Sequence, residues 1–406
     1  MTGVNPDSND LQGMDPAPLA AWLERNTVDS LPTGDLAKKL TKSRESEEPL
    51  RVKLGIDPTA PDIHLGHTVV LSKLREFQDA GHTVVLIVGD LTARIGDPSG
   101  RSKTRPELSR QEIETNARTF QEQAFKILDA NRVEVRHNSE WLDMTMEDLF
   151  RILRLPTVAQ LLERDDFAKR YAEGSPIAVL ELLYPVMQAY DSVAVKADVE
   201  LGGTDQKFNL LLGRDVQSAF DQRPQSVVTL PILPGVDGVR RMGKSLGNHV
   251  GVTEPPEEIF GKTMSIPDDV MPTWYELLMS TAPDPALKAV EQKRFLAKAL
   301  VERFCDTNAA EAAEAHFNRL FRVHEAPEQM SETHFGNLVS DGIVHIPALA
   351  AQAFGISRSE ARRMIQQGGI KITDRVLSAE ELDIPADSLE NAVLRAGKRR
   401  FTRLVP

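Results

Sequence analysis

The period of the hydrophobic positions changes several times along the chain. Arg51 to Ile56 and Thr83 to Val88 are short, mostly aliphatic runs, and each predicts a buried strand. Between them, apolar residues recur at helical spacing from Leu65 to Ala80, and Gly81 ends the predicted helix. A strand, a helix and a second strand in this order predict a parallel sheet with helices on its faces.

The alternation of strands and helices extends beyond this unit. Further strand-like runs are Val133 to Val135, Val193 to Val199 and, more weakly, Val227 to Leu230. Helical patterns precede the unit at Leu19 to Arg25 and at Thr33 to Lys42. The first half of the chain is therefore predicted to have an α/β fold.

The second half is mainly helical until a small module of mixed pattern. Helical patterns cover Glu257 to Phe260, Pro272 to Ser280 and Ala286 to Arg322, and a polar stretch follows. Ile356 to Ile365 predicts a helix, whereas Ile370 to Thr373 and Val393 to Leu404 predict strands. The predicted organisation is a disordered N-terminus (1–17), an α/β domain (18–250), an α-helical domain (251–325), a linker (326–342) and a small α+β domain (343–406).

Composition is that of a water-soluble globular protein. The 406 residues are 41% hydrophobic and 27% charged, and the longest aliphatic run, Val84 to Val88, is far shorter than the roughly 18 residues of a membrane span. No basic run followed by an apolar core opens the chain, so no secretory signal is predicted. Cys305 is the single cysteine, which excludes an intramolecular disulfide and a cysteine-cluster zinc site and points to a reducing cytoplasm.

Charge is distributed unevenly. The net charge of −12 argues against a protein that coats nucleic acid by bulk electrostatics. Residues 343–406, however, contain ten Lys or Arg against seven Asp or Glu, and the last sixteen residues contain five basic and no acidic side chains. A basic module on an acidic body predicts a local polyanion site, with a solvated charged tail as the alternative.

Two histidines begin the predicted helix after the first strand. His64 and His67 are three residues apart, with Gly66 between them, and Asp57-Pro58-Thr59 lies just upstream, at the strand's exit. A helix N-terminus at the carboxyl edge of a parallel sheet favours phosphate, and imidazoles there can donate hydrogen bonds to its oxygens. The motif alone is also compatible with a surface pair of histidines.

A distant loop makes ATP chemistry the better interpretation. Arg241-Met242-Gly243-Lys244-Ser245 places two cations three residues apart in a glycine-rich segment, which suits a loop that closes on a triphosphate. The earlier glycine of a Walker loop is missing. Together the two motifs resemble those of the class I aminoacyl-tRNA synthetases, a likeness that implies a Rossmann-type catalytic domain.

Three polar stretches narrow this resemblance. Tyr184, Gln188 and Asp191 share one helical face in an apolar segment, where polar groups require buried partners. Gly202 to Gln206 and Gly96 to Gly100 are polar turns that follow strands. From about Arg51 to the C-terminus the chain resembles the bacterial tyrosyl-tRNA synthetases, whose usual loop signature, Lys-Met-Ser-Lys-Ser, differs here at Arg241 and Gly243.

The resemblance implies roles for individual residues. Tyrosine would be bound by Asp97, Tyr184, Gln188, Asp191 and Gln206, with Asp191 accepting from the phenol. ATP would be bound by Thr59, His64, Gly66, His67, Asp205, Arg241, Lys244 and Ser245. Among these, His64, His67, Arg241 and Lys244 would act in catalysis; Arg101 and Arg105 would join the anion cage. Lys53 stands where one branch of the family has a tyrosine that also touches the phenol.

The same resemblance implies partners. It predicts ATP with Mg²⁺ but no metal held by the protein, L-tyrosine, tRNA(Tyr), a homodimer formed through an insertion in the 18–250 domain, and no membrane. The 251–325 domain would lie on the anticodon side. The C-terminal module resembles the S4-type RNA-binding domain. Its candidate tRNA contacts are Arg358, Arg362, Lys371, Lys398, Arg399 and Arg400.

Three other functions are compatible with parts of this pattern. A tryptophanyl-tRNA synthetase could also use an aspartate as acceptor. A non-catalytic RNA-binding protein on a synthetase scaffold would not need intact His64, His67 and Lys244. A small-molecule nucleotidyltransferase sharing the histidine motif would not explain the basic C-terminal module.

Overall fold

The computed structural model describes residues 8–59, 62–97, 109–321, 330–373, 375–378, 380–397 and 400–406. The chain divides into two compact units, Met1–Ala297 and Lys298–Pro406, and the division falls within helix α15 (Ala289–Phe304). Within the described ranges, no helix has the length and apolar character needed to cross a membrane.

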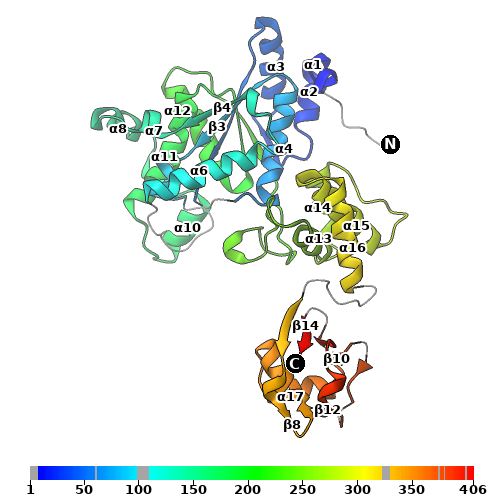
Figure 1. The fold of residues 1–406 in the computed structure, drawn as a ribbon. Coiled ribbons are helices and arrows are strands. Elements are labelled where there is room, and N and C mark those ends of the chain that lie inside the picture. The colour runs from blue at the N-terminus through cyan, green and yellow to red at the C-terminus, as the bar shows by residue number, and fades with distance from the viewer. Residues whose placement is uncertain are drawn as a thin grey trace. The chain divides into compact units, whose positions relative to one another are not determined.

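A six-stranded sheet forms the centre of the first unit (Figure 1). Only its edge strand, β1, runs antiparallel to its neighbour, and the other pairs are parallel. In spatial order the strands are β1 (Asp29–Leu31), β6 (Ser226–Leu230), β5 (Val199–Gly203), β2 (Arg51–Ile56), β3 (Thr83–Val88) and β4 (Val133–His137). The predicted α/β fold with a Rossmann-type sheet is confirmed, and β2 and β3 have the predicted bounds.

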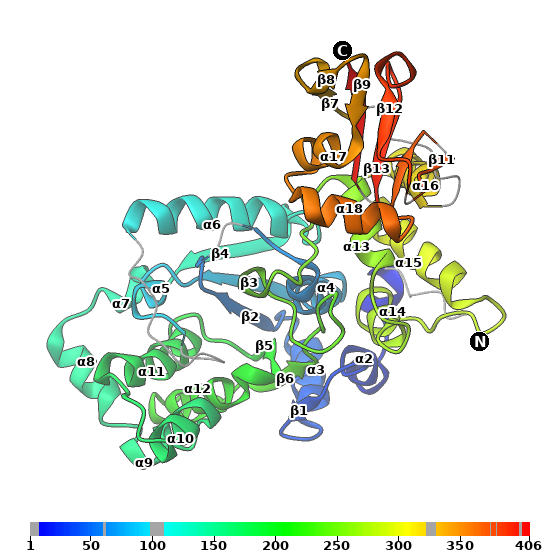
Figure 2. The ribbon, with the colours of Figure 1, turned by 90° about the horizontal axis from the view of Figure 1, so that it is seen from below.

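Helices cover both faces of this sheet (Figures 1 and 2). The connections from β2 to β3 and from β3 to β4 put α4 (Leu65–Asp79) and α6 (Arg110–Ala124) on one face (Figure 2). The chain then returns to β5 and β6 through α11 (Val179–Ala194) and α12 (Lys207–Ala219), which pack together on the other face. The remaining helices of this unit are α1 (Ser8–Gly13), α2 (Pro16–Leu23), α3 (Asp35–Ser46), α5 (Thr92–Ile95), α7 (Ser139–Leu142), α8 (Met146–Leu153), α9 (Val158–Leu161), α10 (Asp165–Ala172), α13 (Pro256–Met264) and α14 (Met271–Met279).

Two predictions within this unit differ from the structure. The run Val193 to Val199 was expected to be a strand, but α11 continues to Ala194, the chain turns at Lys196 with φ of 52°, and β5 begins at Val199. The valines at the helix end are buried against the apolar residues of β3 and α7, and this tertiary packing outweighs their strand propensity. Residues 8–17, expected to be disordered, contain α1 and the start of α2, because Leu11 is buried.

The second unit combines helices and two small sheets. A five-stranded sheet has the order β11-β10-β13-β14-β7 and a three-stranded sheet the order β12-β9-β8. Their strands are β7 (Ser331–His334), β8 (Val339–Ser340), β9 (Ile343–His345), β10 (Ile370–Ile372), β11 (Arg375–Val376), β12 (Asp383–Pro385), β13 (Val393–Ala396) and β14 (Arg400–Val405). The helices are α16 (Thr307–Phe321), α17 (Ile346–Phe354) and α18 (Arg358–Gln366), besides the end of α15.

The second unit corrects the sequence pattern at three places. The helical run Ala286 to Arg322 is two helices, α15 and α16, separated at Cys305 and Asp306. Val393 to Leu404 is not one strand but the antiparallel pair β13 and β14, and Gly397 has the positive φ of 66° that a turn requires. The polar segment expected to be a linker carries β7 and β8, because Thr333 bonds to Thr402 where β7 pairs with β14.

Candidate active site

The two histidines cap the helix that follows β2. His64 is the N-cap of α4, and its Nδ1 accepts a hydrogen bond from Gly66 N at 3.2 Å. Nδ1 of His67 accepts from His64 N, also at 3.2 Å, and the ring centroids are 4.0 Å apart. The segment is fastened from outside as well, since Leu65 N donates to Val250 O. Both rings are therefore held in place by backbone groups.

This arrangement determines the protonation of both rings. Burial, followed by the positive groups nearby, lowers the pKa of His64 to about 2, and burial beside Lys244 lowers the pKa of His67 to about 4. Both imidazoles are neutral at pH 7, and because each Nδ1 accepts a hydrogen bond, the proton of each ring is on Nε2. The site thus presents two N–H donors of fixed orientation without adding two full charges.

The glycine-rich loop is more ordered than its composition suggests. Gly243 N donates to Asn248 Oδ1 at 2.9 Å, and Asn248 Nδ2 donates to Arg241 O at 3.1 Å. Met242 N donates to Leu233 O, and its side chain is buried. The loop was expected to be mobile, but in this state Asn248 and a short backbone pairing hold its base.

Both cations of the loop are paired with carboxylates across the site. Lys244 Nζ contacts Asp62, and this hydrogen bond is the main reason that the pKa of Asp62 is lowered. Arg241 Nη1 lies 3.5 Å from Asp205 Oδ2. Burial raises the pKa of Asp205, and Asp97 acts in the same direction. The two ion pairs hold the loop against the edge of the sheet.

The histidines, the loop and the end of β5 enclose a cleft of about 540 Å³. Its lining includes all eight residues predicted to bind ATP, namely Thr59, His64, Gly66, His67, Asp205, Arg241, Lys244 and Ser245. Apolar side chains such as Val69, Ile232 and Leu246 complete the walls. Apolar walls next to N–H donors and cations suit a nucleotide, which combines an apolar base with charged phosphates.

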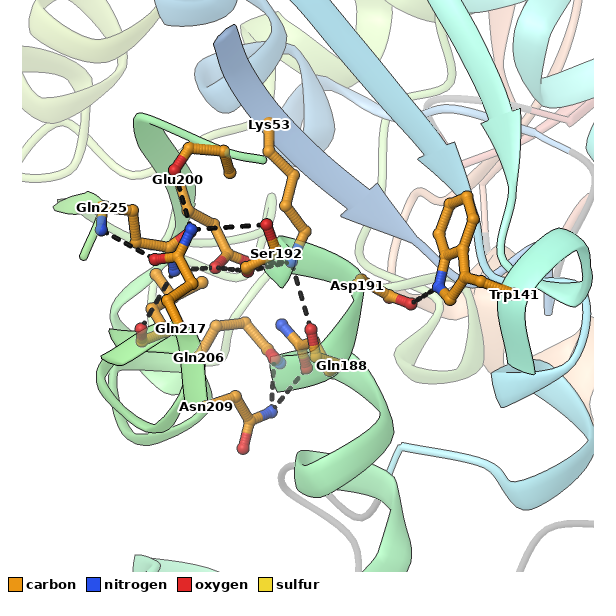
Figure 3. Close-up of polar contacts among 12 residues, drawn as sticks. Lys53, Trp141, Gln188, Asp191, Ser192, Glu200, Gln206, Asn209, Gln217 and Gln225 are labelled. Carbon is orange, nitrogen blue, oxygen red and sulfur yellow. Dashed lines mark hydrogen bonds and ion pairs between the residues drawn. The ribbon is translucent and has the colours of Figure 1, made fainter. Parts of the chain in front are cut away.

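The residues predicted to bind tyrosine lie outside this cleft lining, and three of them, Tyr184, Gln188 and Asp191, are on α11. Figure 3 shows Gln188 and Asp191 on this helix. Tyr184 is buried, and its hydroxyl bonds to Asp57 at the exit of β2; burial first, and then Asp57, raise its pKa well above the usual value. Asp57 Oδ1 also accepts from Thr92 Oγ1 at 2.7 Å. Tyr184 is therefore fixed at the same sheet edge as the histidines.

A chain of amides joins the other predicted residues. Asn209 Nδ2 donates to Gln188 Oε1 at 2.8 Å and to Gln206 Oε1 at 2.9 Å. Gln206 Nε2 donates to Asp97 Oδ2 at 3.0 Å, and Arg164 pairs with the other oxygen of Asp97. Gln188, Gln206 and Asp97 thus form one network with a fixed direction of hydrogen bonds, suited to an ammonium and a carboxylate.

Asp191 lies near the C-terminal end of α11, almost fully buried. Trp141 Nε1 donates to its Oδ1 at 2.8 Å, and Asn138 donates to the carboxylate as well. Burial raises the pKa of Asp191 to about 7, while Lys53 and the two donors oppose this rise. A buried carboxylate with defined donors can accept one further polar hydrogen.

The predicted RNA contacts lie in the second unit. Arg358 and Arg362 are exposed on α18, four residues apart on one face. Arg400 is exposed on β14, and Lys371 is half-buried on β10. Lys398 and Arg399 lie outside the described residues, as do Arg101 and Arg105 of the first unit.

Several residues of the site have no signal in the sequence pattern. Asp62, Trp141 and Asn209 were not singled out, although they bond to Lys244, Asp191 and Gln188. Only the spacing of Asn209, three residues after Gln206 on one helical face, offered a hint. The described ranges hold no group of three or more His, Cys, Asp or Glu placed to bind a metal ion.

Comparisons with known proteins agree on one family. Residues 45–322 match the family model described as tRNA synthetases class I (W and Y). The chain is 48% identical over 396 residues to a tyrosine--tRNA ligase of Moorella thermoacetica, covering 94% of each protein, and 46% identical over 407 residues to that of Thermotoga maritima, covering 96% and 98%. The tyrosyl-tRNA synthetase of Archaeoglobus fulgidus, solved with L-tyrosine, shares the fold with a TM-score of 0.59 at 21% identity, over 74% of this chain and 99% of that one.

Proposed function

The chain belongs to the class I tRNA synthetases of the tryptophan and tyrosine family, and on this premise we propose that it activates L-tyrosine with ATP and transfers it to tRNA(Tyr). In the first step the tyrosine carboxylate attacks the α-phosphate of ATP and pyrophosphate leaves. In the second, a hydroxyl of the terminal ribose of the tRNA attacks the mixed anhydride and AMP leaves. Neither step requires a nucleophile from the protein.

The roles of the ATP residues follow from their geometry. The Nε2–H groups of His64 and His67 donate to phosphate oxygens as negative charge moves toward the leaving pyrophosphate. Lys244 and Arg241 exchange their carboxylate partners for the phosphates, so the loop follows the charge into the transition state. Mg²⁺ bound to ATP would offset part of the phosphate charge. Asp205, released from Arg241, is left to bind the ribose.

The buried carboxylate of Asp191 is the observation that favours tyrosine over phenylalanine. Its carboxylate is buried, and its neighbours are donors that leave it an acceptor. Phenylalanine would leave this acceptor without its phenol donor, and an unsatisfied buried acceptor costs about 1–3 kcal/mol or more when charged. Tyr184, Gln188 and Asp97 would hold the substrate ammonium, and Gln206 would lie near its carboxylate.

The second unit and the exposed apolar side chains support the proposed partners. Arg358, Arg362 and Arg400 are exposed cations for tRNA phosphates. A homodimer would cover apolar side chains on α8 to α11 that are largely exposed in the single chain: Met146, Phe150, Val158, Tyr171, Val179 and Leu180. The lone Cys305 supports a cytoplasmic location.

The direct test is ATP–pyrophosphate exchange in the presence of each of the twenty amino acids. Tyrosine alone should support exchange at a high rate. Exchange that depends on tryptophan and not on tyrosine would overturn the proposal, and no exchange with any amino acid would establish a non-catalytic protein.

The role of the second unit has a separate test. Arg358→Glu combined with Arg362→Glu should leave tyrosine-dependent exchange unchanged and lower aminoacylation of tRNA(Tyr) by tenfold or more, because phosphate contacts contribute most of the affinity for RNA. Glu360→Gln, on the same helix, is the matched control. Loss of exchange in the double variant would contradict this division of labour.

A further inference from the structure

Next to Asp191, a lysine lies where water cannot reach it (Figure 3). Lys53 and Glu200 are side-by-side partners on the parallel strands β2 and β5, and their side chains are 0% and 1% exposed. Lys53 Nζ lies 2.7 Å from Glu200 Oε1. The pair points to the face of the sheet that α11 covers, because Lys53 is in register with Val85, whose side chain packs there.

The ammonium of Lys53 is surrounded by acceptor oxygens of the protein. Besides Glu200, it donates to Ser192 Oγ at 2.8 Å and to the carbonyl of Gln188 at 3.2 Å. An ammonium has three protons, and three acceptors surround this one. Lys53 therefore cannot replace the tyrosine of the related branch as a second donor to the phenol.

The contacts of Lys53 with α11 indicate an indirect role in tyrosine binding. Its two bonds to α11 flank Asp191, since Gln188 and Ser192 lie three residues before it and one residue after it. Glu200 Oε2 accepts from Ser192 Oγ at 3.0 Å and from Gln225, which closes the network around the same helix segment. The pair thus fastens the segment that carries both a predicted ammonium ligand and the predicted phenol acceptor.

Charge is the second part of that role. The largest charge effects on Asp191 come from Lys53 on β2, which lowers its pKa, and from Glu200 on β5, which raises it, while Trp141 and Asn138 at α7 are neutral donors. Helices α5, α8 and α12 pack against α11 through apolar side chains. These are Ile95, Leu149, Ile152, Leu212 and Val216, and none of them carries a charge. Lys53 is thus the positive charge that offsets burial at this carboxylate.

We propose that Lys53 is a specificity-determining positioning residue for tyrosine, which rests on the function proposed above. It holds the segment from Gln188 to Ser192 in place and supplies the charge that keeps Asp191 an acceptor for the phenol hydroxyl. If the ion pair were purely structural, its loss would lower kcat/KM for tyrosine and for phenylalanine by the same factor. If Lys53 acts through Asp191, its loss lowers kcat/KM mainly for tyrosine, because tyrosine alone has the hydroxyl that Asp191 would bind.

The test compares Lys53→Met with Glu200→Gln, because the two changes act on Asp191 with opposite sign. Without Lys53, the pKa of Asp191 rises, and the acid limb of kcat/KM for tyrosine exchange moves to higher pH; without the charge of Glu200 it moves to lower pH. At pH 7, Lys53→Met should lower kcat/KM for tyrosine by about fivefold, because a rise of one unit in a pKa of about 7 reduces the ionised fraction of Asp191 from about one half to about one tenth. The kcat/KM for phenylalanine should change about twofold or less, because phenylalanine makes no bond to Asp191.

Gln217→Leu is the control for a general disturbance of α11. Gln217 is buried, uncharged and bonded to the carbonyl oxygens of Ser192 and Ala197. It should lower thermal stability without moving the pH profile or the ratio of tyrosine to phenylalanine. Equal losses for both amino acids in Lys53→Met, with an unmoved pH profile, would overturn the proposal.

A measurement without substrate separates this inference from the proposed function. Carboxyl ¹³C NMR of the empty enzyme gives the pKa of Asp191 directly, with Asp191→Asn identifying the signal. The pKa should rise in Lys53→Met and fall in Glu200→Gln, and an unchanged value in both variants would refute the inference. Failure of the wild-type enzyme to activate tyrosine would instead refute the proposed function. If Lys53→Met does not fold, Glu200→Gln alone still tests the sign.

Discussion

At the residue scale, the position of the His64 ring requires a glycine at position 66. Gly66 has room for hydrogen only, since a Cβ there would lie 3.0 Å from both Nδ1 and Cε1 of His64. That ring is also the N-cap of α4, so a displaced ring loses its donor orientation and its cap together.

Gly66→Ala is therefore expected to lower kcat/KM for ATP by about tenfold, the equivalent of roughly 1.4 kcal/mol. Binding of tyrosine in the absence of ATP should stay unchanged, which equilibrium dialysis can measure. Gly261→Ala is the matched control, because a Cβ at Gly261 on α13 meets nothing within 4 Å. An effect of equal size in both variants would mean that the space beside His64 is not the cause.

Asp191 predicts a pH dependence of stability. Its pKa is raised to about 7 in the folded protein, so the ionised form is unfavourable there, and its contribution to stability falls as pH rises from about 4 to 7. Asp191→Asn removes this titration. It should raise Tm more at pH 8 than at pH 5, measured by calorimetry, while tyrosine-dependent exchange is lost; a Tm change that is the same at both pH values would contradict the assignment.

At the scale of elements, the structure is predictable where a segment's pattern and its packing agree. The aliphatic runs of β2 and β3 are strands with the expected bounds, and the start of α4 is visible in its histidines. The valines at the end of α11 were misjudged because burial, not propensity, decides their conformation. Trp141 lies 50 residues from Asp191 in the chain, so the local sequence pattern cannot predict the hydrogen bond between them.

The loop that carries Lys244 predicts a change in protease sensitivity. Asp62→Asn removes the carboxylate that holds Lys244 in the empty enzyme, so tryptic cleavage after Arg240, Arg241 or Lys244 should become up to about fivefold faster, as expected for a partly exposed ion pair of up to 1 kcal/mol. ATP should restore protection by offering phosphates in its place. Cleavage as slow in the variant as in the wild type would show that the remaining contacts, from Asn248 and from Asp205, hold the loop without Asp62.

At the scale of the whole molecule, exposed apolar side chains predict the oligomeric state. Val179 at the start of α11 is 76% exposed, and α8 to α10 carry further apolar side chains of this kind. Val179→Glu with Phe150→Glu should shift the protein from dimer to monomer in sedimentation velocity, because each buried charge would oppose association. Val290→Glu, 45% exposed on α15, is the control. A wild-type protein that sediments as a monomer would refute the dimer itself.

The hydrogen bond from Trp141 to Asp191 makes the site optically visible. The chain has three tryptophans, and Trp22 and Trp274 are engaged elsewhere, one beneath the guanidinium of Arg25 and the other bonded to the carbonyl of Pro234. Trp141 alone bonds to the carboxylate that the phenol is proposed to reach. A phenol arriving at that carboxylate would change the emission of a single indole. Titration with tyrosine should thus be readable by intrinsic fluorescence without ATP, tRNA or a label, and the Trp141→Phe variant should lose the signal.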